Sequence, residues 1–159
     1  MPKFKQKTEH KYFIQEVEKC DIKAVKYWLS KIKDIKDIKD DDGDKYYPLN
    51  RAIDFCDYKL FKILVDNGAD VFEFDGEWGF DKSLLSCLCH SDDSKSSEEQ
   101  KELIKMAKLL LKKGVKFTHT YIKGEDFYMN EPLIAAFYGN DELSVFLQLE
   151  YIKQIKKDK

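Results

Sequence analysis

Two apolar stripes with helical spacing lie in residues 47–71 and indicate two short helices. Pro48 stands where the first helix begins, because its missing N–H would be unpaired there in any case. Asp57 is expected to cap the second helix and Gly68 to end it, since glycine adopts the left-handed conformation of a helix stop without cost. The first stripe comprises Leu49, Ala52, Ile53 and Phe55, and the second comprises Leu60, Phe61, Leu64 and Val65. Two helices of this length cannot bury these faces alone, so further copies are expected.

The same pattern recurs when the rest of the chain is aligned on Leu49. Phe13, Leu85 and Leu133 take the place of Leu49 in three further segments. An aspartate that can cap the next helix follows a cysteine or an asparagine in three of the four segments, at Cys20-Asp21, Cys56-Asp57 and Asn140-Asp141. The chain is therefore predicted to contain four helix–turn–helix units and no strand, because no segment shows the two-residue alternation of a strand.

Two stretches depart from the simple repeat. A polar, Ser-rich insertion at about residues 91–97 is expected to form a solvated loop inside the third unit. The sequence SEEQ at residues 97–100 is interpreted as a capping box that starts a long helix reaching about Lys113. Residues 32–40, with the sequence IKDIKDIKD, are interpreted as the tail of a helix that passes into the first connecting loop.

Three segments resemble parts of the ankyrin repeat, which opens with the pattern T-P-L-H-x-A. PLNRA at residues 48–52 and PLIAA at residues 132–136 are similar to that opening, and LVDNGADV at residues 64–71 is similar to the end of the second helix. The resemblance implies an all-α, ankyrin-type helix–turn–helix solenoid with extended finger loops that turn near Gly76 and Gly124. It also implies one domain over residues 1–159, with units at about 8–40, 44–75, 80–118 and 128–155 and with outer units that cap the core.

The Thr and His that brace the first turn of an ankyrin repeat are replaced in this chain. The two positions hold Tyr47 and Asn50 in the second unit, Ser83 and Ser86 in the third, and Glu131 and Ile134 in the fourth. The stacking that the resemblance implies is therefore expected without that hydrogen bond.

Composition and charge exclude several classes of protein. Hydrophobic residues make up 43% of the chain, which suffices for a core, and the formal net charge of −2 gives no global attraction for nucleic acid. No apolar run has the length of a signal peptide or a transmembrane helix. We therefore expect a cytoplasmic protein, with delivery into a host cell as the alternative if the source is a parasite, symbiont or virus.

Neither the cysteines nor the acidic residues form a motif for catalysis or metal binding. Cys87, Cys89 and His90 could contribute to a metal site, but Cys87 and Cys89 point in opposite directions on a helix, and a role in the core is favoured. Asp40, Asp41, Asp42 and Asp44 could hold a divalent cation, although a solvated acidic turn is favoured because the spacing of a calcium loop is missing. No nucleophile–base motif or phosphate loop is present, so neither enzyme activity nor a cofactor is predicted.

Aromatic residues supply the candidate binding site. They make up 14% of the chain, and many lie in the predicted finger loops, where they either anchor a partner or pack on each other. The resemblance to ankyrin repeats implies a protein–protein interaction module that binds through its fingers and first helices, and acidic residues near the fingers favour a partner with a basic patch and apolar pockets. The predicted contact residues are Tyr46, Tyr47, Arg51, Phe74, Glu77, Trp78, Phe80, Phe127 and Tyr128.

Two other functions remain open at this point. The same surface would suit an immunity-type or inhibitor protein that neutralises a toxic enzyme by covering its active site. A metal protein or enzyme built on Cys87, Cys89 and His90 is the third class. A monomer without nucleic-acid or membrane partners is expected, since the basic residues form no stripe interleaved with aromatics.

Overall fold

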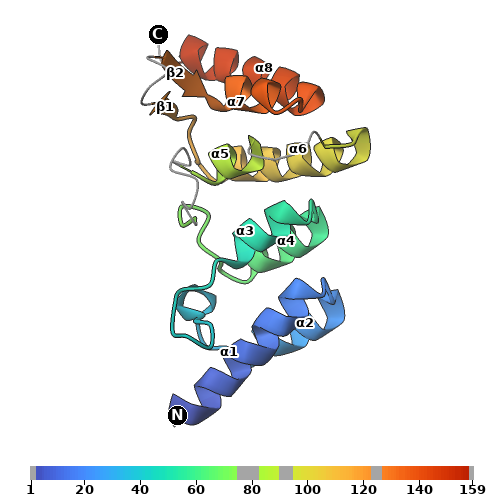
Figure 1. Cartoon of the computed structure of the whole chain (residues 1–159), viewed down its shortest axis with the longest axis vertical. Helices are drawn as coiled ribbons and strands as arrows, with labels where there is room; N and C mark the ends of the chain where they lie inside the picture. The colour runs from blue at the N-terminus through green and yellow to red at the C-terminus, as the bar shows by residue number, and fades with distance from the viewer. Residues whose placement is uncertain (1–2, 75–82, 90–94, 123–126, 158–159) are drawn as a thin grey trace. The chain divides into compact units, whose positions relative to one another are not determined.

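The computed structural model describes residues 3–74, 83–89, 95–122 and 127–157, and most of them are helical (Figure 1). The chain divides into two compact units, Met1–Asp70 and Val71–Lys159, and each unit contains two helix pairs. The four predicted helix–turn–helix pairs are therefore present. The prediction that the chain contains no strand is wrong, because two strands of four residues each occur in the second unit.

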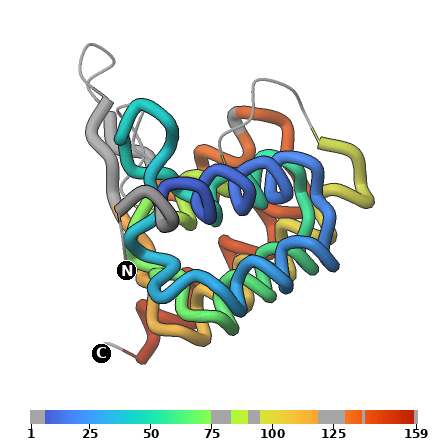
Figure 2. The backbone as a smooth tube through the Cα atoms, turned by 90° about the horizontal axis from the view of Figure 1, so that it is seen from below, coloured from blue at the N-terminus to red at the C-terminus, as the bar shows by residue number. Residues whose placement is uncertain are grey.

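The first unit consists of two helix pairs joined by a loop. The helices are α1 (Lys3–Glu18), α2 (Ile22–Leu29), α3 (Pro48–Asp54) and α4 (Tyr58–Asp66), with a short 3₁₀ helix, η1 (Ile35–Asp37), in the loop. After α2 the chain crosses back to the side of α1 (Figure 2). The predicted stripes form the core of this unit, which includes Phe13, Val17, Val25, Leu49, Ala52, Ile53, Leu60, Phe61, Leu64 and Val65.

Cysteines occupy the left-handed position that ends the first helix of each pair in this unit. Cys20 has a φ of 54° and Cys56 a φ of 51°, so they share one turn position, as the sequence alignment predicted. The next residues, Asp21 and Asp57, accept hydrogen bonds from the first free N–H groups of α2 and α4. The stop of one helix and the cap of the next are thus consecutive residues, which makes both turns tight.

Local chemistry fixes the two ends of the α3–α4 pair as predicted. Pro48 is the first residue of α3. Gly68 follows α4 with a φ of 95°, and the N–H of Ala69 donates to the carbonyl oxygen of Leu64 at 3.0 Å, which is a Schellman stop. By contrast, Phe55 does not continue the buried stripe of α3, because 39% of its surface is exposed.

The run at residues 32–40 does not continue α2, which ends at Leu29. It contains η1, capped by Asp34, whose carboxylate accepts the N–H of Lys36 at 2.9 Å. A period of three residues matches the 3₁₀ helix, with three residues per turn, and Ile35 and Ile38 are both buried. The interpretation of this run as the tail of an α-helix is wrong, because a three-residue period is that of a 3₁₀ helix.

The second unit contains two further helix pairs and a β-hairpin. The helices are α5 (Leu84–Cys89), α6 (Ser97–Lys112), α7 (Glu131–Phe137) and α8 (Asp141–Lys157). Strands β1 (His119–Ile122) and β2 (Phe127–Asn130) are antiparallel, and the Ile122–Phe127 pair brackets residues 123–126, where the sequence predicted a finger to turn. That turn itself, Gly76, and residues 91–94 of the predicted insertion lie outside the described residues.

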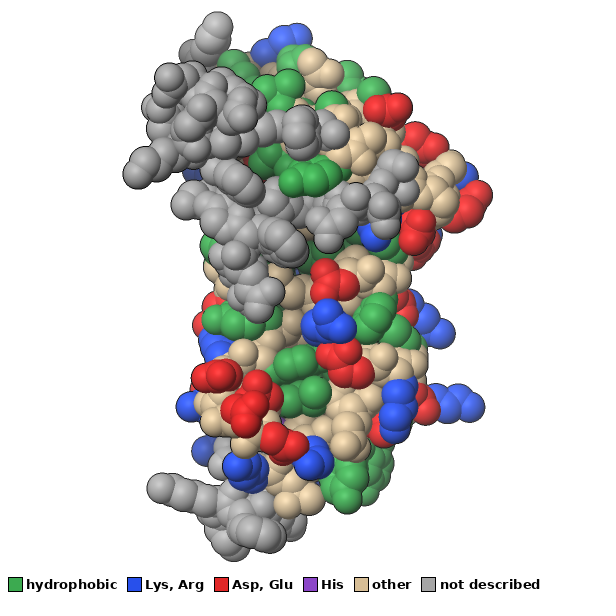
Figure 3. All heavy atoms as spheres, in the orientation of Figure 1, with side chains coloured by type: hydrophobic (Ala, Val, Ile, Leu, Met, Phe, Trp, Pro, Cys, Tyr) green, Lys and Arg blue, Asp and Glu red, His purple; other side chains and the backbone are tan. Residues whose placement is uncertain are grey.

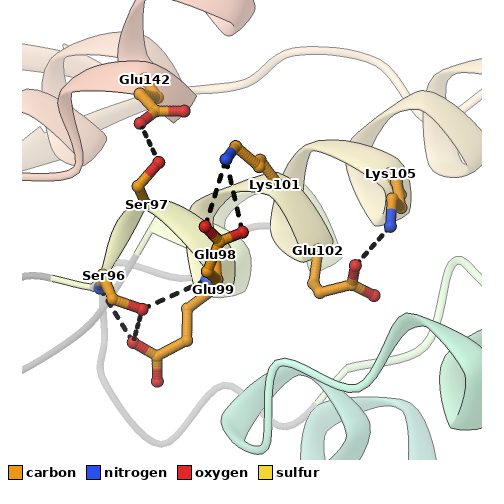
Figure 4. Close-up of polar contacts among 8 residues, drawn as sticks. All are labelled: Ser96, Ser97, Glu98, Glu99, Lys101, Glu102, Lys105 and Glu142. Carbon is orange, nitrogen blue, oxygen red and sulfur yellow. Dashed lines mark hydrogen bonds and ion pairs between the residues drawn. The ribbon is translucent and has the colours of Figure 1, made fainter.

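The capping box of the long helix α6 begins one residue earlier than predicted. Ser96 is the cap: its hydroxyl accepts the N–H of Glu99, and the Glu99 carboxylate accepts the N–H of Ser96 at 2.8 Å (Figure 4). The Ser97 hydroxyl instead donates to Glu142 of α8 at 2.6 Å. Because both serines precede a Glu-Glu-Gln run, the sequence alone could not decide between them.

The side chain of Gln100 in α6 caps the start of another helix, α8. Its Oε1 accepts the N–H groups of Glu142 at 2.9 Å and Leu143 at 3.2 Å, which lack partners within their own helix. Its Nε2 donates to the carbonyl oxygen of Lys95 at 2.8 Å. This buried amide therefore ties the start of α8 to the start of α6.

The fourth pair is displaced by one residue from its predicted register. Leu133, the predicted equivalent of the buried Leu49, is 53% exposed, whereas Ile134 and Ala135 are buried. The left-handed stop is Gly139, with a φ of 74°, and Asp141 is the first residue of α8 instead of its cap. The left-handed stop comes six residues after Leu133 but seven residues after Leu49, so alignment on Leu133 carried the error forward.

A buried polar chain provides a brace between α5 and α7 in place of the Thr–His pair. The hydroxyl groups of Ser86 and Thr118 lie 3.4 Å apart, and Thr118 donates to the Glu131 carboxylate from its hydroxyl at 2.8 Å and its N–H at 2.9 Å. Ser86 and Glu131 are fully buried. These residues come from α5, α7 and the segment before β1, so the brace links elements instead of closing one turn.

Gln100→Ala should lower the free energy of unfolding by about 2 kcal/mol, because it leaves the buried N–H groups at the start of α8 without an acceptor. Urea denaturation followed by circular dichroism measures this change. Lys101→Ala, at the exposed neighbouring position, serves as the control and should cost less than about 0.5 kcal/mol. Equal effects of the two substitutions would contradict the capping role.

Candidate protein-binding site

The first connecting loop is folded around the carboxylate of Asp40. Its Oδ1 accepts the N–H groups of Asp42, Gly43 and Asp44 at 2.9–3.0 Å, and Gly43 has the left-handed φ of 97° that this turn requires. Lys39 pairs with Lys45 across the turn. We call residues 38–46 the Asp40 turn. The side chains of Asp41, Asp42 and Asp44 are exposed, as expected for a solvated acidic turn.

Two contacts attach the Asp40 turn to α1. Lys11 forms an ion pair with Asp41 at 2.8 Å. The N–H of Lys39 donates to Nδ1 of the buried His10 at 3.3 Å. Burial lowers the pKa of His10 below its ordinary value of 6.5, although the carboxylates of Glu9 and Asp37 oppose this shift. The neutral imidazole is the form that can accept this hydrogen bond.

The end of the turn is held by a network centred on Glu18 of α1. Arg51 of α3 donates to both carboxylate oxygens, from Nε at 2.9 Å and from Nη2 at 2.8 Å, and the Tyr46 hydroxyl donates to Oε1 at 2.7 Å. The remaining guanidinium nitrogen, Nη1, donates to Asp54 at 2.7 Å. The guanidinium also lies 5.1 Å from the ring centroid of the exposed Phe55. We call Glu18, Tyr46, Arg51, Asp54 and Phe55 the Glu18 cluster.

The charges of the Glu18 cluster reinforce one another. The hydrogen bond from Arg51 lowers the pKa of Glu18, with a further contribution from Tyr46 and against the opposing effect of burial. Burial, together with the hydrogen bond to Glu18, raises the pKa of Tyr46. Glu18 is therefore a carboxylate and Tyr46 a neutral donor at neutral pH, which keeps the Arg51 side chain in one orientation.

Only part of the predicted contact set can be placed together. Tyr46 and Arg51 share the Glu18 carboxylate, and the half-buried Tyr47 lies beside them in sequence with Lys45 Nζ 5.7 Å from its ring centroid. Phe74, half-buried, belongs to the second unit. Phe127 and Tyr128 pair with Ile122 and Tyr121 in the hairpin. Glu77, Trp78 and Phe80 lie outside the described residues.

Comparisons of the chain with family models, with curated proteins and with solved structures found no match. The function must therefore be inferred from the residues themselves. Sequence reasoning missed Glu18, Asp54 and the exposure of Phe55. The one available signal was that Phe55 ends the first stripe, at the last turn of a short helix.

The other candidate chemistry is not assembled in the part of the chain that the structure describes. Cys87 and Cys89 are buried on α5, as the core interpretation predicted, and the Cys89 thiol donates to the carbonyl oxygen of Leu85 at 3.1 Å. Within the described ranges, no three His, Cys, Asp or Glu side chains form a group that could hold a metal ion. His90 lies outside these ranges. None of the described helices has the length and apolar character needed to cross a membrane.

Arg51→Ala should lower the free energy of unfolding by about 1 kcal/mol, because it removes a bidentate ion pair that is partly exposed. Arg51→Lys should have an intermediate effect, since an ammonium group cannot form both hydrogen bonds. Lys62→Ala is a matched control that removes the exposed pair with Asp66 within α4, at less than about 0.5 kcal/mol. An effect of Arg51→Ala no larger than that of Lys62→Ala would contradict the anchoring role of Glu18.

His10 should make stability depend on pH. Because its pKa is lower in the folded than in the unfolded state, the unfolded state binds more protons as the pH falls below about 7. The contribution of His10 is complete above pH 6.5 and is lost as the pH falls through the lowered pKa. Urea denaturation between pH 7.5 and pH 5 should therefore show a smaller loss of stability in His10→Gln, and equal losses would argue against a neutral His10. The lowered pKa of Glu18 acts in a separate window, below its ordinary value of 4.5.

Proposed function

We propose that this chain is a non-catalytic protein–protein interaction module of the ankyrin-repeat type, and that the Glu18 cluster with the Asp40 turn forms its principal contact surface. The fold supports this proposal in three ways. Two of the helix pairs have a proline within their first two residues, at Pro48 and Pro132, two pairs end at Gly68 and Gly114, and a hairpin precedes the last pair. These are features of the repeat that the sequence resembles.

The observation that carries the proposal is the order imposed on a half-buried arginine that lies beside an exposed aromatic ring. Arginine and tyrosine are enriched among the residues that dominate binding energy. Long side chains usually lose conformational entropy when a partner orders them, at about 0.5–1.5 kcal/mol each. The side chains of Arg51 and Tyr46 are already fixed on Glu18, so little of that entropy remains to be lost. Phe55 stands beside the guanidinium and offers apolar surface to a partner.

The negative charge around the cluster favours a partner that carries basic residues. Asp41, Asp42 and Asp44 are exposed on the Asp40 turn, which ends at Tyr46. Asp54 is also exposed, and it accepts from Nη1, the guanidinium nitrogen that does not contact Glu18. Carboxylates around an aromatic ring favour a protein that presents Lys or Arg next to an apolar pocket. Such attraction would also make association faster at low salt.

Phe55→Ser should reduce capture of the partner at least ten-fold, because it removes the apolar contact and leaves the Glu18 network in place. Tagged full-length chain is incubated with extract of its source cells, and captured proteins are quantified by mass spectrometry against Tyr27→Ser, which removes an exposed aromatic ring on α2. Circular dichroism must show unchanged helix content in both variants.

Two further variants define the chemistry of the surface. Asp41→Asn with Asp42→Asn should weaken capture of the same protein and reduce its dependence on salt concentration. Phe74→Ala tests the predicted contact in the second unit. A partner retained equally by the wild type, Phe55→Ser and the double Asn variant would contradict the proposed surface, whatever its identity.

A further inference from the structure

Helix α8 has two apolar faces, and only one of them is buried. Leu143 and Leu147 are fully buried in the second unit, where α8 packs against α6 and α7. On the other side of the helix, Val145 is 59%, Leu149 55% and Ile152 42% exposed. A surface helix of a globular protein is normally polar on the side that faces water. Here about three successive turns present large aliphatic groups instead, because Ile155 is exposed as well.

This face departs from the expectation that the outer units cap the core. Terminal units of a repeat protein need a polar outer face to remain soluble. In the second unit, α7 adds Leu133, which is also more than half exposed. An exposed apolar patch of this kind marks an interaction site more often than a plain surface.

The charges at the two ends of the stripe indicate what covers it. At 3.6 residues per turn, Asp141, Val145, Leu149, Ile152 and Lys156 lie along one side of α8. The first turn of the helix carries Asp141 and Glu142, and the last turn carries Lys156 and Lys157. The stripe is therefore acidic at one end, apolar in the middle and basic at the other end. The upper part of Figure 3 shows green side chains between red ones on one side and blue ones on the other.

We propose that the exposed face of α8 binds the same face of a second copy of this chain, with the two α8 helices antiparallel. In that arrangement the acidic first turn of each helix meets the basic last turn of the other, and the apolar stripes meet in the middle. A parallel arrangement would place like charges together. A two-fold axis requires a surface that is complementary to itself, and a stripe with opposite charges at its ends meets that requirement. A membrane surface is disfavoured because two carboxylates lie at one end of the stripe.

The dimer is expected to be weak, since a patch of a few aliphatic side chains is smaller than a standard interface. Sedimentation equilibrium of the full chain should show reversible association from the 18.8 kDa monomer, with a dissociation constant of roughly 10–100 µM. Leu149→Lys should raise that constant at least ten-fold. Tyr27→Lys, which places the same charge on an exposed ring of α2, should leave it unchanged. A chain that remains monomeric up to about 0.5 mM, as it would if another protein or segment is the occupant, overturns the proposal.

Charge exchange tests the antiparallel arrangement directly. Asp141→Lys makes both ends of the stripe basic, and Lys156→Glu makes its last turn more acidic, so each variant alone should dimerise more weakly than the wild type. An equimolar mixture should recover association, because the basic ends of one variant then meet acidic groups of the other. Circular dichroism checks that α8 is retained in each variant. Weak homodimers without recovery in the mixture, or variants that dimerise like the wild type, contradict the antiparallel pairing.

Discussion

A single carboxylate, that of Glu18, joins the three segments that form the proposed binding surface. It lies at the end of α1 and accepts hydrogen bonds from Arg51 of α3 and from Tyr46 at the end of the Asp40 turn. Without it, Arg51 would keep only its ion pair with the exposed Asp54, and the turn would lose one of its attachments to α1. The proposed surface is therefore ordered by hydrogen bonds within the chain itself, so its side chains would need little rearrangement on binding.

The sequence predicted those parts of the fold that depend on local chemistry. Pro48, Asp57, Gly68 and the two left-handed cysteines act within one turn of their own positions, and each occurs where the pattern placed it. Two of the errors arose where two local solutions were nearly equal. Ser96 and Ser97 both precede an acidic run, and the register of the fourth pair differed by one residue at Leu133.

The candidate site was less predictable because it depends on contacts between distant residues. Tyr46 and Arg51 were identified from their types and positions, but their common partner, Glu18, is separated from both in sequence and has no motif of its own. The buried chain from Ser86 to Glu131 was missed for the same reason. Polar networks of this kind are determined by tertiary packing, which periodicity does not encode.

Site-specific photo-crosslinking tests the central claim, that the Glu18 cluster faces a protein partner, most directly. A benzophenone amino acid is introduced at position 55 and, as a control, at position 27, and each full-length chain is irradiated in cells that express it. Position 55 should form one dominant protein adduct that excess unmodified chain suppresses, whereas position 27 should not form it. The same adduct from both positions, or none from position 55, would contradict the account.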